Sequence, residues 1–368
     1  MKQAGFVDPI SKVVMRKLWR IFLYGHGLVT PLLYRRKSNP RVFYGGARSG
    51  DIGGPLVKVK RLQKYYPEHR VTYNLVYLLS NTPYLLKITL NRLQKKNIPI
   101  VLNQNGVFYP GWYQGAWEEN NAIMAKAYHA ADFVFWQSEF CRYAADKFLG
   151  RRIGIGKVLY NAVDTQQFCP AISGHKSGSF MFLMTGKIGK HLTYRLESTI
   201  AGLSFARKAG LDCALRIDGW IEDINGVTKL AMLYEVEKHV IIGKRYSQEQ
   251  APSVYQNADA YVMTKYLDPC PNTVIEAMAC GLPILYSNSG GVPELVGPDA
   301  GVGLDLPEDW LNVHVPSAEA IAIGMGKIID DCQSMGTAAR LRACTLFDIQ
   351  DWLTQHQLIF EQLLCKRI

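Results

Sequence analysis

The chain has 368 residues, of which 48% are hydrophobic and 20% charged, and its mean hydropathy is −0.04. This length predicts two packed cores, at roughly 100–200 residues per domain, and the composition excludes a disordered or fibrous chain. No run approaches the roughly 20 unbroken apolar residues of a spanning helix, which argues against a multi-span membrane protein, and the net charge of +11 indicates an anionic partner.

Residues 1–37 hold much of that charge, since they carry eight Lys and Arg and a single acidic residue, Asp8. Residues 10–23 predict an amphipathic helix with separate apolar and basic stripes. The apolar stripe comprises Ile10, Val13, Val14, Leu18 and Ile21, and the basic stripe Lys12, Arg16 and Arg20. Such a helix is typical of an anionic membrane surface. The alternative is a helix packed on the protein's own core. Nucleic acid is disfavoured as a partner, because no nucleic-acid fold motif follows.

From residue 41 onward, short β-rich runs alternate with helical runs, which is typical of parallel sheets covered by helices. The first series predicts strands at 41–44, 70–75, 98–102 and 132–136, with helices at 55–66, 83–96 and 139–149. The second predicts strands at 179–185, 214–218, 239–242, 260–263 and 283–287, with helices at 195–210, 247–257, 273–279, 318–331 and 347–364. We therefore expect an α/β protein of two doubly wound Rossmann-like domains facing a cleft, with residues 1–37 as a basic helical extension.

A glycine-rich loop follows the predicted strand at 41–44. Gly53 and Gly54, at the end of this loop, predict a close backbone approach to an anion or sugar at a helix amino terminus, with simple turn geometry as the alternative.

The eight cysteines are scattered without a CxxC pair, and no secretory signal precedes them. We expect a reducing, cytoplasmic location and no zinc site.

The segment 266–297 carries the most specific chemistry. Asp268 lies in a predicted loop, and Glu276 lies about one turn inside the helix that follows. Prolines stiffen the loop, so the backbone N–H groups of Asn272, Thr273 and Val274 should point outward at the helix start, where they favour a phosphate. Glu276 is then suited to accept hydrogen bonds from a diol such as a ribose, and Asp268 from sugar hydroxyls. Diol, diphosphate and sugar together describe a nucleotide-sugar.

These residues resemble the E-x7-E signature of the retaining GT-B glycosyltransferases of family 4, the group 1 transferases, with Asp268 in place of the first Glu. The runs 276–284 and 289–296 are similar to that family almost residue by residue, and residues 161–170 resemble its interdomain element. The resemblance implies an acceptor-side domain at 38–165, a nucleotide-sugar domain at 166–345, and a last helix at 346–368 that crosses back to the first domain.

The resemblance also implies a donor site without a metal or cofactor, in which cations neutralise the departing diphosphate. Lys187 takes that role together with a second cation, either Arg195, which the register favours, or Lys190. Gly186 and Gly219 would border the nucleotide at the ends of two strands.

In the first domain, the family often places a His after the strand that we expect at 98–102, where this chain has Asn103 and Asn105. Amides hold hydroxyls but cannot act as a base, so the departing phosphate would deprotonate the acceptor in a front-face reaction. The alternative is a structural turn. Tyr109 and Trp112 belong to an aromatic run that predicts either an acceptor platform or core packing.

Taken together, these features predict a metal-independent glycosyltransferase, of the hexosyltransferase type, that moves a sugar from a UDP- or GDP-sugar to a hydroxyl acceptor with retention. The basic extension favours a lipid-linked saccharide in surface polysaccharide synthesis as acceptor, at the inner face of a membrane. The alternatives are a soluble transferase acting on a free sugar or sugar phosphate, and a nucleotide-sugar-binding partner without catalysis.

Overall fold

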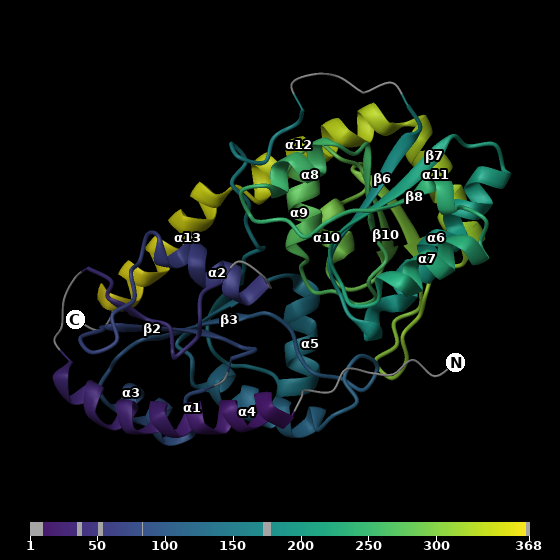
Figure 1. Cartoon of the computed structure of the whole chain (residues 1–368). Coiled ribbons are helices and arrows are strands. Elements are labelled where there is room, and N and C mark those ends of the chain that lie inside the picture. The colour runs from purple at the N-terminus through teal and green to yellow at the C-terminus, as the bar shows by residue number, and fades with distance from the viewer. Residues whose placement is uncertain (1–9, 35–38, 51–53, 83, 172–177, 366–368) are drawn as a thin grey trace. The chain divides into compact units, whose positions relative to one another are not determined.

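The structure is a computed structural model that describes residues 10–34, 39–50, 54–82, 84–171 and 178–365. The described chain divides into two compact units, each a parallel sheet with helices against it (Figure 1). The C-terminal unit is formed by Asn161–Ile349. The N-terminal unit is formed by residues 10–160 together with residues 350–365.

The N-terminal unit is built on five parallel strands in the order β1-β2-β3-β4-β5. They are β1 (Val42–Phe43), β2 (Leu75–Leu79), β3 (Ile100–Gln104), β4 (Phe133–Trp136) and β5 (Gly156–Val158). Its helices include α2 (Gly54–Gln63), α3 (Lys87–Lys95), α4 (Trp117–Ala130) and α5 (Glu139–Leu149). Every residue of β2, β3 and β4 is buried, as expected of parallel strands covered on both faces.

The last helix, α13 (Ile349–Cys365), completes the core of this unit. His356 is fully buried on it, and its Nε2 lies 3.0 Å from the Tyr77 hydroxyl of β2. Its Nδ1 donates to the Trp352 carbonyl at 2.8 Å, and Phe360 packs edge-on to Tyr77. Burial lowers the pKa of His356 to about 3, so the ring is neutral and Nε2 accepts from Tyr77.

The C-terminal unit is built on six parallel strands in the order β11-β10-β9-β6-β7-β8. They are β6 (Phe180–Ile188), β7 (Cys213–Ile221), β8 (Val240–Ile242), β9 (Ala260–Met263), β10 (Ile284–Asn288) and β11 (Gly301–Asp305). Its helices are α6 (Thr193–Lys208), α7 (Ile224–Leu233), α8 (Ala251–Gln256), α9 (Asn272–Ala279), α10 (Val292–Val296), α11 (Ala318–Asp330) and α12 (Cys332–Leu346), with short 3₁₀ turns such as η2 (Lys190–Leu192). The core lies between the sheet and helices α6 and α11, where Ile217, Ile200 and Ile321 are buried together.

Helix α1 (Ile10–Val29) lies on the N-terminal unit and continues past Gly25 and Gly27 into η1 (Thr30–Leu33). It contacts the unit through Trp19, whose Nε1 donates to the Gly46 carbonyl at 3.1 Å, and through buried Leu23. The predicted apolar stripe faces away from the protein, since Ile10 is 83% and Ile21 67% exposed. Within the described ranges, no helix is long and apolar enough to cross a bilayer.

Several elements differ from the sequence prediction, since helices α4, α7, α10 and α12 and strands β5 and β11 were not predicted. Two of the differences have reasons that are visible in the structure. The strand expected at 70–75 begins instead at Leu75, because Asn74 is held by hydrogen bonds to Arg41 N and Asn39 O outside the sheet. Helix α12 was not expected, since small residues such as Gly336 and Ala339 give it little apolar periodicity. A Cβ on Gly336 would lie 2.5 Å from the Gly281 carbonyl, so close packing against the end of α9 stabilises this helix.

Candidate functional site

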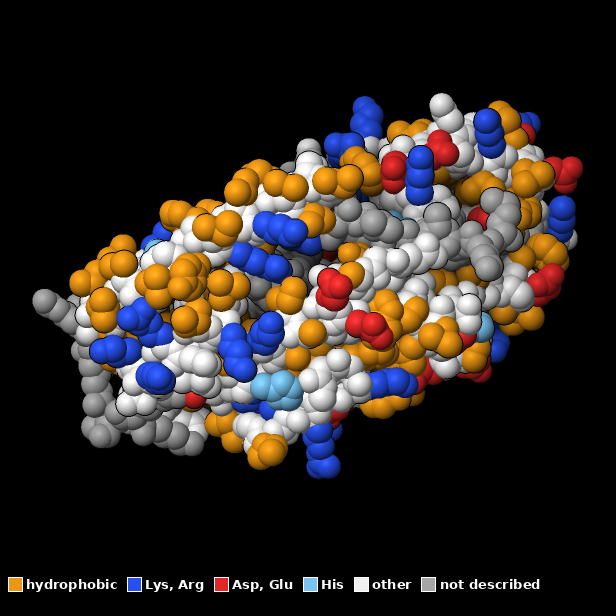
Figure 2. Space-filling view, turned by 90° about the horizontal axis from the view of Figure 1, so that it is seen from below, with side chains coloured by type: hydrophobic (Ala, Val, Ile, Leu, Met, Phe, Trp, Pro, Cys, Tyr) orange, Lys and Arg blue, Asp and Glu red, His pale blue; other side chains and the backbone are white. Residues whose placement is uncertain are grey.

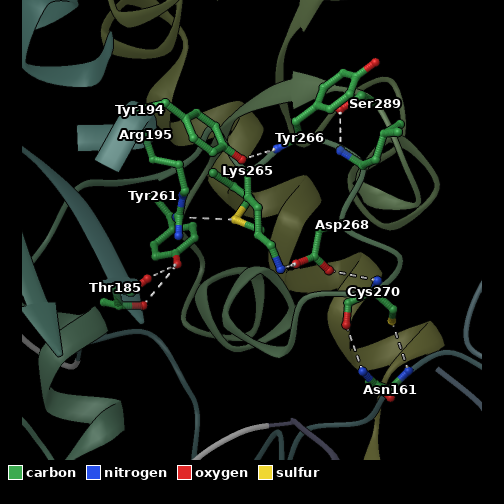
Figure 3. A network of polar contacts seen from close by, with 12 residues as sticks. Asn161, Thr185, Tyr194, Arg195, Tyr261, Lys265, Tyr266, Asp268, Cys270 and Ser289 are labelled. Carbon is green, nitrogen blue, oxygen red and sulfur yellow. Dashed lines mark hydrogen bonds and ion pairs between the residues drawn. The ribbon is translucent and has the colours of Figure 1, made fainter. Parts of the chain in front are cut away.

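The candidate site is a loop of the C-terminal unit that runs from β9 to α9 at the carboxyl ends of the parallel strands (Figure 3). Its backbone is fixed by Ser289–Gly291: the Ser289 hydroxyl accepts from Leu267 N at 3.2 Å, and Gly291 N donates to the Asp268 carbonyl at 2.9 Å. Gly290 has φ +69°, and a Cβ there would lie 2.6 Å from the Asp268 carbonyl. Only glycine allows this approach.

Both carboxylate oxygens of Asp268 are already engaged within the loop. Oδ2 lies 2.7 Å from the Lys265 ammonium, and Oδ1 accepts from Cys270 N at 3.1 Å. Asn161 donates to the Cys270 carbonyl at 2.8 Å and so ties the loop to the start of the unit. The loop therefore holds Asp268 in one orientation before any ligand arrives.

Helix α9 begins where the sequence predicts, but its first turn differs in one respect. Val274 N donates to the Pro271 carbonyl at 3.2 Å, so it does not point outward as expected. The N–H groups of Asn272 and Thr273 have no partner among the described residues. Two outward donors at the start of an eight-residue helix remain suited to an anion.

Glu276 lies one turn further along α9 and is buried. Its Oε2 accepts from the Tyr255 hydroxyl of α8 at 3.0 Å. Burial raises the pKa of Tyr255, and the Glu276 carboxylate adds to the rise, so this hydroxyl remains a donor. Tyr255 therefore orients the Glu276 carboxylate.

Arg195 lies near the same helix start, on α6, and is only 4% exposed (Figure 3). Its Nη2 lies 3.7 Å from the Met263 thioether, its Nε has no partner, and within the described part of the chain it has no ion pair. Burial raises the pKa of Tyr261, while the Arg195 guanidinium and a hydrogen bond from Thr273 oppose the rise. Arg195, Tyr261 and Thr273 are therefore neighbours. A buried guanidinium without a counter-charge is costly, and an anion would relieve that cost.

The two lysines predicted for this region are both exposed. Lys187, near the end of β6, places its ammonium over the Trp220 ring, 5.0 Å from the ring centroid. Lys190 begins η2, and its backbone N donates to Glu222 at 2.8 Å. Gly219 has φ +121°, and a Cβ there would lie 2.3 Å from the Gly186 carbonyl, which explains the glycine pair at these two strand ends.

In the N-terminal unit, the predicted acceptor residues form part of a buried amide cluster. Lys58 of α2 donates to Asn103 Oδ1 at 2.7 Å and to Asn105 Oδ1 at 3.3 Å, and Gln137 donates to both amides. Asn103 is fully buried, whereas Asn105 is half-buried. Lys58, on α2, was not predicted; its position four residues after Gly54 would have been the signal.

The remaining predicted residues of this unit are divided between core and loop. Tyr109 is buried and packs edge-on to Trp112, at 6.1 Å between ring centroids, which is the geometry of core packing. Gly54 is the first residue of α2, and Gly53 lies outside the described residues. Among the side chains that the structure describes, no group of three His, Cys, Asp or Glu is placed to hold a metal ion.

Comparison with known proteins identifies the C-terminal part of the chain. Residues 170–342 match the family model described as Glycosyl transferases group 1. This segment is a group 1 glycosyltransferase domain. The domain contains the β9–α9 loop, the exposed Lys187 and Lys190, and Arg195. The match confirms the predicted resemblance to group 1 transferases.

The chain also has a distant curated relative. The chain is 23% identical over 209 residues to MMP alpha-(1->4)-mannosyltransferase of Mycolicibacterium hassiacum. The alignment covers 55% of this chain and 47% of that enzyme, so the chain matches about half of its relative's length.

Solved structures resemble the chain over a larger share of its length. HepE of Anabaena, in complex with UDP, has a TM-score of 0.64 at 17% identity and covers 84% of this chain, with 82% of its own chain matched. Sucrose-phosphate synthase of Thermosynechococcus elongatus has a TM-score of 0.62 at 18% identity, with 84% and 77% coverage. Together with the two parallel sheets, these similarities confirm the predicted two-domain α/β fold of the GT-B type.

Proposed function

We propose that this protein transfers a sugar from a nucleoside diphosphate sugar, carrying UDP or GDP, to a hydroxyl acceptor with retention of configuration. The observation that carries the proposal is Arg195, a buried cation that has no ion pair within the described residues and that acts, like Thr273 at the start of α9, on Tyr261. The distant relative is a mannosyltransferase and the solved neighbour HepE binds UDP, which supports a diphosphate as the missing anion.

In this proposal the diphosphate lies at the start of α9, where the N–H groups of Asn272 and Thr273 donate to it. Arg195 and Lys187 neutralise the charge that develops as it leaves, work that needs no metal ion in this arrangement. Lys190 is exposed beside them and is available to the outer phosphate. Glu276, oriented by Tyr255, accepts hydrogen bonds from the ribose hydroxyls.

The reaction itself breaks the bond between the sugar's anomeric carbon and the phosphate oxygen. The acceptor oxygen forms its new bond on the same face, and its proton passes to the departing phosphate. This route suits the acceptor side of the molecule, because the side chains of Asn103, Asn105 and Gln137 are amides that cannot take up a proton. Asp268, fixed by Lys265 and Cys270, orients the transferred sugar through its remaining lone pairs.

The first test of this function is whether the protein binds a nucleoside diphosphate. Thermal unfolding with UDP, GDP and ADP should show stabilisation by at least one of them, and sugar transfer should release that diphosphate from its sugar donor. Donor binding without turnover for any hydroxyl acceptor would favour a non-catalytic binding protein. Absence of binding by all three nucleotides would refute the proposal.

We further propose that the acceptor is presented at an anionic membrane on the cytoplasmic side, where a lipid-linked saccharide would be extended for a surface polysaccharide. The support is the outer face of α1, where Val14, Leu18 and Phe22 are exposed beside Lys17. Figure 2 shows hydrophobic side chains interspersed with Lys and Arg over the N-terminal unit. An exposed apolar stripe flanked by cations suits the boundary between lipid headgroups and acyl chains.

The membrane surface has its own test. The double substitution Leu18→Glu and Ile21→Glu should abolish pelleting with vesicles of phosphatidylglycerol and phosphatidylcholine, because it places charges in the apolar stripe. The matched control is Leu233→Glu, which changes a leucine on α7 of the other unit that is 71% exposed, against 57% for Leu18 and 67% for Ile21. Equal pelleting of the double variant and the control would refute membrane binding through α1 and favour a soluble acceptor.

A further inference from the structure

Lys265 is a charged residue of the donor site for which the sequence pattern and the proposed reaction supply no role. It follows β9 by two residues and precedes Asp268 by three, and its ammonium lies 2.7 Å from Asp268 Oδ2 (Figure 3). The Lys265 side chain is 36% exposed and that of Asp268 is 12% exposed. The pair therefore lies at the edge of the site, with the lysine on the more open side.

The backbone around Lys265 is held at several points. Tyr266 N donates to the Tyr194 hydroxyl at 3.1 Å, and Leu267, with φ +49°, donates to the Ser289 hydroxyl. The Tyr266 hydroxyl in turn accepts from Asp309 N at 2.7 Å. A lysine on a loop fixed from both sides has a restricted reach, so its ammonium stays near the start of α9.

The charge of Lys265 also acts on His191 in η2. Burial lowers the pKa of His191 in η2, and the charges of Lys265 and Lys187 lower it further, against an opposing effect of Glu222. The Lys265 ammonium therefore lies within electrostatic range of η2, which follows the strand that carries Lys187. Cations from β6 and from the β9–α9 loop thus converge on one region.

This convergence resolves a conflict in the site. Asp268 carries a negative charge on the loop that leads into α9, where the diphosphate of the proposed donor would lie. The Asp268 carboxylate and the diphosphate are both anions, so they repel each other in a partly buried environment. This repulsion would weaken donor binding. An ammonium between them neutralises the carboxylate and attracts the phosphate.

We propose that Lys265 is a positioning and specificity residue of the donor site, which holds Asp268 and adds a further cation toward the donor diphosphate. The inference rests on the proposed function and deepens it, because it assigns the recognition of the phosphates over the nucleoside to a residue outside the family signature. Lys265 touches no reacting atom in this account. It sets how strongly the site prefers a nucleoside diphosphate to the nucleoside alone.

The test compares Lys265→Met with Lys265→Arg in calorimetric titrations of UDP against uridine and of GDP against guanosine. We expect Lys265→Met to weaken binding of the diphosphate at least tenfold and that of the nucleoside less than twofold. Lys265→Arg should stay within threefold of the unsubstituted protein. The matched control is Lys208→Met, which removes a lysine paired with Glu235 on the surface of the same unit and should change neither affinity.

A second measurement separates phosphate recognition from simple support of Asp268. In a protein that already carries Asp268→Asn, Lys265→Met should still weaken diphosphate binding at least fivefold. Loss of the Lys265 effect in that background, or an unchanged ratio of diphosphate to nucleoside affinity, would overturn the assignment of Lys265 alone. Failure of the unsubstituted protein to bind any of these nucleotides would overturn the proposed function itself.

Discussion

Replacing Arg195 with methionine should weaken nucleotide binding without lowering the free energy of unfolding of the ligand-free protein. Methionine has a similar length and keeps the apolar packing of a side chain that is 4% exposed. The substitution removes a buried charge that has no ion pair among the described residues, so the free energy of unfolding should stay the same or rise. Loss of binding together with retained stability is the signature of a residue kept for its ligand.

The expected loss of affinity follows from the strength of hydrogen bonds to charged groups. Such bonds contribute about 1.5–3 kcal/mol, which corresponds to a roughly 10- to 150-fold weaker binding of UDP or GDP. At 100 times its dissociation constant a ligand stabilises the folded protein by about 2.7 kcal/mol. A 100-fold loss of affinity would reduce this to about 0.4 kcal/mol at the same ligand concentration.

Thermal unfolding with and without nucleotide measures both effects in one experiment. The matched control is Arg207→Met on the same helix, because Arg207 is paired with Asp212 at 2.6 Å on the surface. That variant should keep the full ligand-induced shift. If Arg195→Met unfolded the free protein at a markedly lower temperature and left the ligand-induced shift intact, Arg195 would be a structural residue and the reasoning would fail.

Three further predictions address the loop, the ribose contact and the N-terminal core. In denaturant titrations, Gly290→Ala should lower the free energy of unfolding by about 1–3 kcal/mol, because a φ of +69° strains an L residue. The control is Gly326→Ala in α11, where a Cβ meets only Leu211 at 3.6 Å, and it should be neutral or stabilising. Glu276→Gln should weaken UDP binding about tenfold and should remove the penalty for 2′-deoxy-UDP seen with the unsubstituted protein; additive losses would contradict a ribose contact. His356 has its pKa lowered to about 3 by burial, so the stability it contributes is complete above pH 6.5 and falls by about 1.4 kcal/mol per pH unit below that. His356→Gln should flatten this slope between pH 6.5 and 4, and parallel melting curves of the two proteins would refute it.

Local signals in the sequence predict several elements of this structure to within a residue. Helix α5 begins after Ser138, whose hydroxyl accepts from Cys141 N as an amino-terminal cap, and β9 is a short apolar run with no competing pattern. The start of α9 follows from Pro271 at the N-cap position, because proline has no N–H group to donate within a helix but is tolerated at its start. These features depend on residues that are close in the sequence, so they can be predicted without knowledge of the tertiary structure.

Features that depend on distant residues could not be predicted in the same way. The apolar stripe of α1 was visible, but the face that contacts the protein depends on Gly27, where a Cβ would lie 2.5 Å from Thr89 of α3. The sequence register favoured Arg195 as a site cation, yet only the fold shows that it is buried against Met263. The ion pair between Lys265 and Asp268 was not predicted, although opposite charges three residues apart commonly pair and the sequence shows both residues.

The contribution of α13 to the N-terminal core has a consequence for how the nascent chain folds. The five strands of that unit leave the ribosome early, but His356 and Phe360, which pack against Tyr77, are synthesised only after the whole C-terminal unit. The C-terminal unit is complete as soon as Ile349 emerges, so it can fold first. The unit translated first is therefore finished last, and a stop codon before Gln350 would leave its hydrophobic interior open to chaperones and proteases.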